Sequence, residues 1–295
     1  MSRKFRLDRD ARRRIDDEFP EGIAEDYSNY DEYDEELEYK KDRRRRRTAR
    51  LVIRLTVLCL VLLAVMTGAL LYTGYIWFNE PRKRDYPYRG PIIDADMGKI
   101  GWQAFSQQNI QFAYITATKG KSYVDECFEY NRKNGEPTDL PLGYLHIFEP
   151  KQNGRAQAEH FIDIVGQNMI GRLIPAVEVE YSGLDRLITP DIENSVENLK
   201  EYVQEIESQY GVKPVLLCRE AEYRQLILPY DEFEGCPIWI DSVFTEPDKD
   251  IDWTLWTYTP RAKYRYYDGD KYVDVAVLNG GKSDFKSILV PKNVQ

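Results

Sequence analysis

An uninterrupted apolar stretch constrains this chain more than any other feature of its sequence. Residues 55–79 contain no charged side chain, and residues 55–77 read LTVLCLVLLAVMTGALLYTGYIW. As a helix with a rise of about 1.5 Å per residue, this stretch can cross a hydrocarbon core of about 30 Å. Its aromatic residues Tyr72, Tyr75 and Trp77 gather at the far end, as a membrane–water interface favours. We therefore predict a transmembrane helix over residues 55–79.

Charges are segregated on the N-terminal side of this helix. Residues 16–38 carry 12 acidic side chains and no basic one, whereas residues 40–54 carry nine basic side chains and one acid, Asp42. Few apolar residues interrupt these blocks, so we predict that residues 1–54 are disordered. Because cytoplasmic flanks are rich in basic residues, the N-terminus is expected inside the cell and residues 80–295 outside.

Two other interpretations of the apolar stretch stay open. A cleaved signal peptide fits less well, because its apolar core is shorter and lies closer to the N-terminus. A buried core helix is the second, although such a long charge-free stretch is rare in soluble folds.

The net charge of the outer part limits its partners. The 295 residues carry a formal net charge of −9, and residues 80–295 alone contain 25 basic and 35 acidic side chains. A domain this acidic is not expected to bind nucleic acid or anionic lipid through bulk charge. The basic residues 40–54, in contrast, are suited to contact anionic lipid.

Eight short β-rich stretches follow the apolar helix. They cover residues 91–94, 112–117, 142–148, 173–180, 214–218, 237–241, 255–259 and 272–277. Helical patterns lie between the earlier ones, at residues 102–108, 124–134, 155–167 and 190–210. This alternation predicts an α/β fold of parallel strands with helical crossovers, and eight strands suit a TIM-like barrel. A doubly wound open sheet is the alternative, although no Gly-rich phosphate loop follows any strand.

The fourth predicted strand ends in two carboxylates, Glu178 and Glu180. Side chains two residues apart on a strand share a face, so these acids are expected to lie about 6–7 Å apart. Mutual repulsion and desolvation would raise the pKa of one and leave the other ionised. Glycoside hydrolysis needs such a pair, an acid that protonates the leaving oxygen and a carboxylate that stabilises positive charge. A solvated strand end with two exposed acids is the alternative.

Other acids lie at or near predicted strand ends. Asp94 ends the first strand, Asp96 follows it, and Asp274 lies within the last. In a parallel barrel the C-terminal ends of the strands meet at one face. We therefore predict that Asp94 and Asp274 join Glu178 and Glu180 at the mouth of the barrel.

Aromatic rings in the outer part are candidates for stacking on sugars. Trp102, Trp239, Trp253 and Trp256 all lie there, and core packing is the alternative for each. The sequence contains no zinc-ligand spacing and no G-x-S-x-G motif, so neither metal nor serine-hydrolase chemistry is expected.

The outer part contains a series of short motifs in a specific order and spacing. They read IDAD (93–96), GKIGW (98–102), FAYITATKG (112–120), YVD (123–125), GYLHIF (143–148), PAVEVE (175–180), WTY (256–258) and VDVA (273–276). In this respect residues 88–285 resemble glycoside hydrolase family 25, the lysozymes or N-acetylmuramidases of bacteria, phages and some fungi. The resemblance implies an irregular (β/α)5β3 barrel that needs no cofactor.

The resemblance also implies roles for individual residues. Glu180 matches the general acid of the family, and Glu178 falls where the family has an Asp that stabilises the cationic sugar or orients its acetamido group. Asp94 and Asp274 match two further cleft aspartates. Our candidate substrate-binding residues are Asp96, His146, Trp239, Trp256 and Tyr258.

The chain departs from the family pattern at several positions. Glu178 replaces Asp, and the other differences are Gly101, Thr116, Leu145, Ile147, Thr257 and Ala276. A displacement of about 1 Å costs on the order of 10²-fold in rate. These differences motivate an alternative function, a weakened or inactive barrel that binds cell-wall glycan.

The resulting prediction is a single-pass cell-membrane protein with an extracellular peptidoglycan muramidase at residues 80–295. It would hydrolyse the β-1,4 bond between N-acetylmuramic acid and N-acetylglucosamine, with peptidoglycan and membrane as partners. In a further alternative the cytoplasmic tail carries the function, and a partner of unknown identity recognises its tyrosines, Tyr27, Tyr30, Tyr33 and Tyr39. A solvated leader that fixes topology is the simpler interpretation of the tail.

Overall fold

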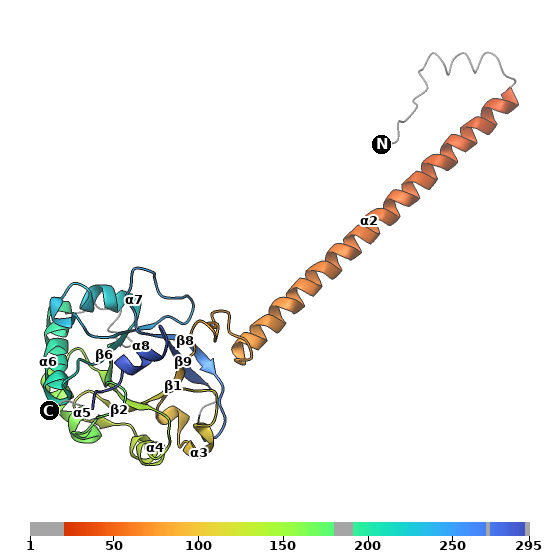
Figure 1. Ribbon diagram of the computed structural model, residues 1–295. Coiled ribbons are helices and arrows are strands. Elements are labelled where there is room, and N and C mark those ends of the chain that lie inside the picture. Colours follow the sequence, from red (N-terminus) through yellow and green to blue (C-terminus); the bar gives the residue numbers. More distant parts are fainter. Residues whose placement is uncertain (1–20, 180–190, 270–271, 293–295) are drawn as a thin grey trace. The chain divides into compact units, whose positions relative to one another are not determined.

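The structure, a computed structural model, describes residues 21–179, 191–269 and 272–292, without the side chains of residues 21–32 and 34. The chain divides into two compact units, Met1–Ala69 and Leu70–Gln295. The first contains most of a single long helix, and the second is a closed β-barrel with helices outside it (Figure 1).

The long helix, α2, covers Glu21–Tyr72. It includes both charged blocks, so the structure differs from the predicted disorder of residues 1–54 from Glu21 onward, and residues 1–20 lie outside the described residues. Glu, Lys, Arg and Leu are good helix formers, and they extend an apolar helix that already supplies the nucleus. Lys40 and Glu36, one turn apart, form an ion pair at 2.7 Å. The helix ends at Tyr72, before the predicted end at residue 79, and Gly74 follows with a φ of +66°.

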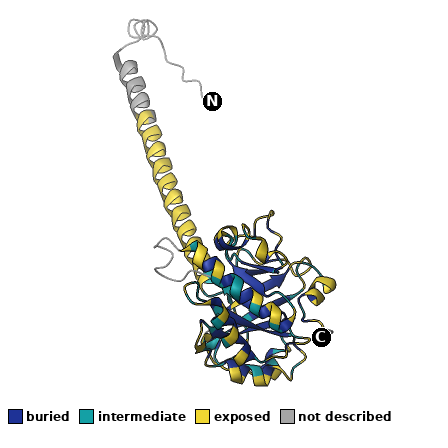
Figure 2. Ribbon diagram, turned by 90° about the vertical axis from the view of Figure 1, so that its left-hand side faces the viewer, coloured by how far each residue is buried: buried dark blue, intermediate teal, exposed yellow. Residues whose placement is uncertain are grey.

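Helix α2 exposes its apolar side chains to solvent (Figure 2). Leu55, Leu58 and Leu62 all keep more than half of their surface exposed. Among the described residues it is the one helix that is long and apolar enough to cross a membrane, a test that a signal sequence also passes. It is therefore a candidate membrane span.

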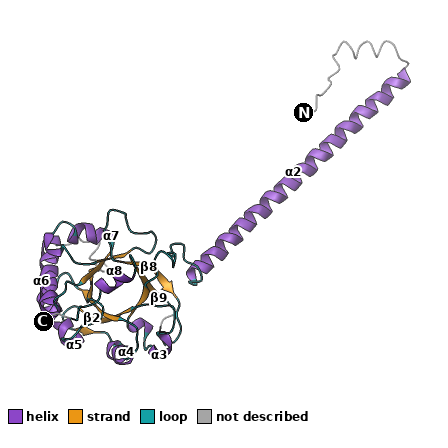
Figure 3. Cartoon of the chain, viewed as in Figure 1, coloured by secondary structure: helices purple, strands orange, loops and turns teal. Residues whose placement is uncertain are grey.

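Eight strands close the barrel in the described part of the second unit (Figure 3). They are β1 (Arg89–Ile93), β2 (Ala113–Lys119), β4 (Leu142–Phe148), β5 (Ala176–Val179), β6 (Val215–Cys218), β7 (Ile238–Asp241), β8 (Leu255–Ala262) and β9 (Val273–Leu278). Each coincides with one of the eight predicted strands. Because β1 pairs with both β2 and β9, the sheet closes on itself, and the short β3 (Tyr123–Val124) only pairs antiparallel with the end of β2.

The last strand corrects the expectation of parallel pairing throughout. From β1 to β8 the ring neighbours run parallel, but β9 is antiparallel to both β8 and β1. The chain between Ala262 and Val273 is too short for the helical crossover that a parallel return requires. The beginning of β9, rather than its end, therefore lies at the face where the other strands end.

Helices cover the outside of the barrel (Figure 3). They are α3 (Trp102–Phe105), α4 (Phe128–Gly135), α5 (Gly154–Val165), α6 (Ile192–Tyr210) and α7 (Glu220–Glu222), with short turns η1 (Ala95–Met97), η3 (Tyr223–Ile227) and η4 (Asp231–Phe233). Helix α8 (Lys282–Ser287) instead lies across the end of the barrel where the strands begin, with Phe285 against Tyr88 and Phe112 (Figure 3). Helix α6 buries an apolar stripe that includes Val196, Leu199 and Val203. It packs so closely on α5 that a Cβ on Gly154 would lie 1.6 Å from the carbonyl oxygen of Asn198. Together these helices keep solvent away from the outer face of the strands.

Candidate active site

A cleft of about 500 Å³ opens where β1, β2 and β4 end. It is lined by Asp94, Ala95, Asp96, Thr116, Lys119, Lys121, Ser122, Tyr123, Asp125, Ile147, Glu149 and Gln152, most of which carry polar groups. The predicted site residues Asp94 and Asp96 therefore both lie in this cleft. Two lysines, Lys119 and Lys121, lie among the acids of this lining, and Lys119 Nζ lies 3.6 Å from Glu149 Oε1.

Strand register places Glu178 on the same side as this cleft. Glu178 on β5 lies level with Ile147 on β4 and with Leu217 on β6. Side chains level with one another on neighbouring strands share a face of the sheet, and Ile147 lines the cleft. Glu178 consequently points toward the mouth, while Val179 points the other way. Glu180, the predicted general acid, lies outside the described residues.

The turn after β1 is built on two carboxylates. Asp94 Oδ1 accepts a hydrogen bond from the backbone N–H of Met97 at 3.2 Å. Asp125, which is buried, accepts one from the backbone N–H of Ala95 at 2.8 Å. Burial raises the pKa of both carboxyls, and neighbouring negative charge adds to it, from Asp96 on Asp94 and from Asp94 on Asp125. The acids of this turn thus hold protons more tightly than ordinary aspartates.

Asp274 has the most clearly perturbed carboxyl of the mouth. It is the second residue of β9 and reaches this face because that strand runs antiparallel. Burial among the surrounding protein atoms, followed by the negative charges of Asp241 and Asp94, raises its pKa to about 7. Its side chain still keeps an exposed surface, so solvent screening limits the energy behind this shift. A carboxyl with such a pKa remains partly protonated near neutrality, as general acid catalysis requires.

The structure does not bring His146 to the cleft. Its ring is fully buried on the outer face of β4, stacked on Tyr202 of α6 with centroids 5.0 Å apart. The two ring nitrogens bond to Thr118 Oγ1 at 2.7 Å and to Gln157 Oε1 at 3.3 Å. Burial lowers its pKa to about 3, so His146 is a neutral packing residue. Its neighbour Ile147 faces the cleft instead, because adjacent strand residues alternate.

The three predicted sugar-binding aromatics also lie away from the cleft. Trp239 is fully buried inside the barrel, 5.0 Å from the ring of Tyr114, and its indole N–H donates to Thr257 Oγ1 at 2.9 Å. Trp256 and Tyr258 flank Thr257 on β8 and point outward, where both are buried. Trp256 lines a separate hollow with Tyr86 and Glu246, so none of the three lines the cleft at the ends of β1, β2 and β4.

Sequence reasoning passed over several residues of the mouth. Lys119, Lys121, Tyr123 and Asp125 line the cleft, and Asp241 affects the pKa of Asp274. Asp241 ends a predicted strand just as Asp94 does, so the strand-end rule already contained the signal. Lys119 is the last residue of β2 and the other three follow it within a few residues, beyond the predicted strand end at residue 117, where that rule was not applied.

Metal ligands are not grouped in the part of the chain that the structure describes. No three His, Cys, Asp or Glu side chains there are arranged to hold an ion. The cysteines Cys59, Cys127, Cys218 and Cys236 are free thiols.

Comparison with known protein families places the chain in a family. The sequence pattern of the glycosyl hydrolases family 25 matches residues 93–265, more than half of the chain. The chain belongs to this family. It is therefore a glycoside hydrolase of the lysozyme type, and its eight-stranded closed barrel is the family fold.

Individual relatives agree with this placement. A family 25 glycosyl hydrolase from Bacillus anthracis is 32% identical with a TM-score of 0.65, and the match covers 71% of this chain and 96% of that one. The protein YegX of Escherichia coli (strain K12), which is uncharacterized, is 25% identical over 211 residues, 69% of this chain and 74% of YegX. Lysozyme M1 of Streptomyces globisporus is 24% identical over 206 residues, 65% of this chain and 68% of the lysozyme.

Proposed function

We propose that this chain is a membrane-tethered muramidase that hydrolyses the β-1,4 bond between N-acetylmuramic acid and N-acetylglucosamine. The observation that carries the proposal is the meeting of Asp94, Glu178 and Asp274 at the mouth of one barrel. Membership of a family of lysozymes supports peptidoglycan as the substrate.

The proposed chemistry divides the work among these acids. Glu180 protonates the leaving glycosidic oxygen and then takes a proton from water. Glu178 stabilises the positive charge that develops on the sugar, and Asp94 and Asp274 hold the acetamido group or add to that stabilisation. Burial of carboxyls and, after it, their mutual repulsion support this division, because they raise the pKa of Asp94 and Asp274 and keep some of the acids protonated at a pH where others are ionised.

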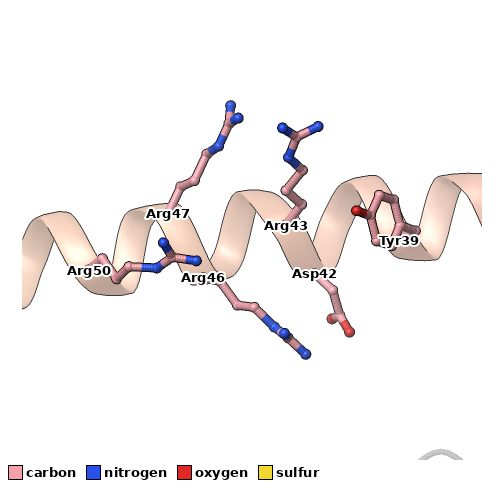
Figure 4. A pocket seen from close by; sticks show the side chains of 6 residues that line it. All are labelled: Tyr39, Asp42, Arg43, Arg46, Arg47 and Arg50. Carbon is pink, nitrogen blue, oxygen red and sulfur yellow. The ribbon is translucent and has the colours of Figure 1, made fainter.

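The proposal that the chain is tethered to the membrane is based on helix α2. Its charge-free part is preceded by the basic residues 40–54, which favours a cytoplasmic N-terminus and an extracellular barrel. Figure 4 shows the guanidinium groups of Arg43, Arg46, Arg47 and Arg50 spreading from the helix in different directions. Such an array suits the phosphates of lipid headgroups on the cytoplasmic side.

The decisive experiment incubates the full chain, in detergent micelles, with purified peptidoglycan. New reducing ends are then reduced with borohydride and identified. Cleavage of the proposed bond yields muramitol, whereas cleavage of the other glycosidic bond would yield glucosaminitol and contradict the assignment. Glu180→Gln is expected to lose about 10²–10⁴-fold in rate. The matched change Glu159→Gln, on an exposed position of α5, leaves the rate unchanged.

Binding without cleavage would instead support the alternative of a glycan-binding barrel. In that case the wild-type chain sediments with peptidoglycan, releases no reducing ends, and binds equally well as Glu180→Gln. The replacements at Glu178, Leu145, Thr257 and Ala276 are the features that favour this alternative.

Topology is tested separately in intact cells. A membrane-impermeant maleimide is expected to label Leu228→Cys, which is exposed on the barrel, and not Thr48→Cys, which lies in the basic block. The reverse pattern would show that the barrel faces the cytoplasm.

A further inference from the structure

Exposed apolar side chains of the second unit gather where α2 ends. Tyr72, Tyr75, Ile76 and Phe78 expose 71%, 75%, 43% and 57% of their surfaces, and Phe244, far away in sequence, exposes 69%. We call these five residues the aromatic collar. A cluster of large exposed apolar side chains marks a contact surface rather than chance exposure.

Hydrogen bonds and ring packing hold the collar in place. The indole N–H of Trp77 points to the carbonyl oxygens of Val243 at 3.0 Å and Tyr258 at 2.7 Å. The ring of Trp77 stacks on Phe78 with centroids 5.0 Å apart. Phe78 in turn stacks on Phe244, at 5.8 Å and an interplanar angle of 13°. The collar is therefore joined to β8 and to the loop after β7, and its open rings are not merely the end of a loose linker.

Cationic side chains border the collar. Lys263 Nζ lies 4.6 Å from the ring centre of Tyr75, and the guanidinium of Arg261 lies 4.8 Å from that of Tyr72. Aromatic rings beside lysine and arginine are the composition of a membrane–water interface, where the rings enter the headgroup region and the cations meet phosphates.

We propose that the aromatic collar inserts into the interfacial region of the outer leaflet and gives the barrel a second membrane contact besides α2. This inference rests on the proposed role of α2 as a membrane span. Continuity of the chain favours lipid as the occupant, because α2 runs without a break into Tyr72, the first residue of the collar. A second copy of the chain and a glycan strand are the other candidates for this surface.

The contact has a consequence for the substrate. Phe244 lies in the loop after β7, and Asp241, the last residue of β7, raises the pKa of Asp274 at the mouth. Insertion of Phe244 thus holds the mouth close to the outer leaflet. The enzyme then acts on glycan strands next to the membrane rather than on the outer layers of the wall.

Spin labels on the full chain in lipid nanodiscs test this inference. The background carries Cys59→Ala to remove the exposed native thiol. Labels are placed at Phe244→Cys and Phe78→Cys, with Leu228→Cys, an exposed apolar position outside the collar, as the matched control. A label at Leu63→Cys, within α2, reports separately on the membrane span.

The readout is the accessibility of each label to dissolved oxygen and to a water-soluble nickel complex. Both collar labels are expected to favour oxygen and to be shielded from nickel, reversing the ratio found at Leu228. Collar labels as accessible to nickel as Leu228, with Leu63 shielded, would overturn the collar contact and leave the anchor intact. Exposure of Leu63 to nickel would overturn the anchor itself.

Two further outcomes would assign the collar surface to an occupant other than lipid. Broadening of the collar spectra that grows with the number of chains per disc would assign the surface to a second copy. Slowing of an otherwise water-exposed collar label on addition of peptidoglycan fragments would assign it to glycan.

Discussion

Neutralising Asp274 is expected to stabilise the barrel at neutral and alkaline pH but not in acid. The folded state raises the pKa of this carboxyl from the ordinary 3.8 to about 7. Between these values the folded protein keeps a proton that the unfolded chain has already lost. Stability that depends on Asp274 is therefore complete below about pH 4 and declines as the pH rises toward 7. Asp274→Asn removes this decline because the amide does not ionise.

The magnitude follows from the size of the shift. A pKa that rises from 3.8 to about 7 corresponds to about 4 kcal/mol if the carboxyl is fully shielded. Because Asp274 keeps an exposed side chain, solvent reduces its desolvation and screens its repulsion by Asp241 and Asp94, and we expect about 1–2 kcal/mol. For a domain of this size, 1 kcal/mol moves the Tm by roughly 2–4 °C. Asp274→Asn should therefore raise the Tm by about 2–8 °C at pH 8.

Thermal unfolding of the full chain in detergent, followed at pH 4, 6 and 8, measures this effect. The difference between Asp274→Asn and wild type should be near zero at pH 4 and largest at pH 8. Asp163→Asn, on an exposed position of α5, is the matched control and should show no such trend. Equal stability of Asp274→Asn and wild type at all three pH values would refute the raised pKa that burial and neighbouring charge give Asp274. The same variant should lose muramidase activity, which would make Asp274 a site where function costs stability.

The remaining predictions concern one residue each. Glu178→Asp, which restores the residue of the family pattern, should keep at least wild-type activity. Glu178→Gln should lose about 10²-fold in reducing-end release. An equal loss of activity in both variants would contradict a role for the negative charge at this position. Gly154→Ala should destabilise the barrel by about 1–3 kcal/mol in thermal unfolding, because its Cβ would lie 1.6 Å from the backbone oxygen of Asn198. Gly281→Ala is the control, because a Cβ added there would meet no neighbouring residue within 4 Å. Thr118→Val should cost about 1–3 kcal/mol in the same assay by leaving a buried nitrogen of His146 without its partner, and an unchanged Tm would argue against that bond.

Local sequence patterns were enough to find the strands, but not to decide which side chains face the mouth. The apolar run at residues 142–148 predicted β4 with its observed bounds. Within that strand, His146 and Ile147 point to opposite faces, and only the folded barrel shows that Ile147 faces the cleft while His146 packs on the outer helices. A shift of one residue in register would exchange the two, so no inspection of the strand alone can separate them.

Helix α2 shows a different limit of sequence reasoning. Charge density argued for disorder in residues 1–54, because such a segment cannot bury apolar surface. That argument treats the segment as independent of its neighbour. Attached to an apolar helix, residues from Glu21 onward extend existing turns and avoid the cost of nucleation, as the described helix shows.

The reversal of β9 connects the fold to the chemistry proposed for it. Asp274 is the second residue of β9, and a parallel β9 would have placed the beginning of the strand at the opposite end of the barrel, away from Asp94 and Asp241. Among the described strands of the ring, the one that breaks the parallel order thus supplies the acid with the most clearly raised pKa. The short connection after β8 forces the reversal, and the reversal brings the third carboxyl to the mouth. A longer connection that keeps Val273 paired with Ala262 should therefore leave Asp274 at the mouth, because the register of β9 and not the length of the loop fixes its position.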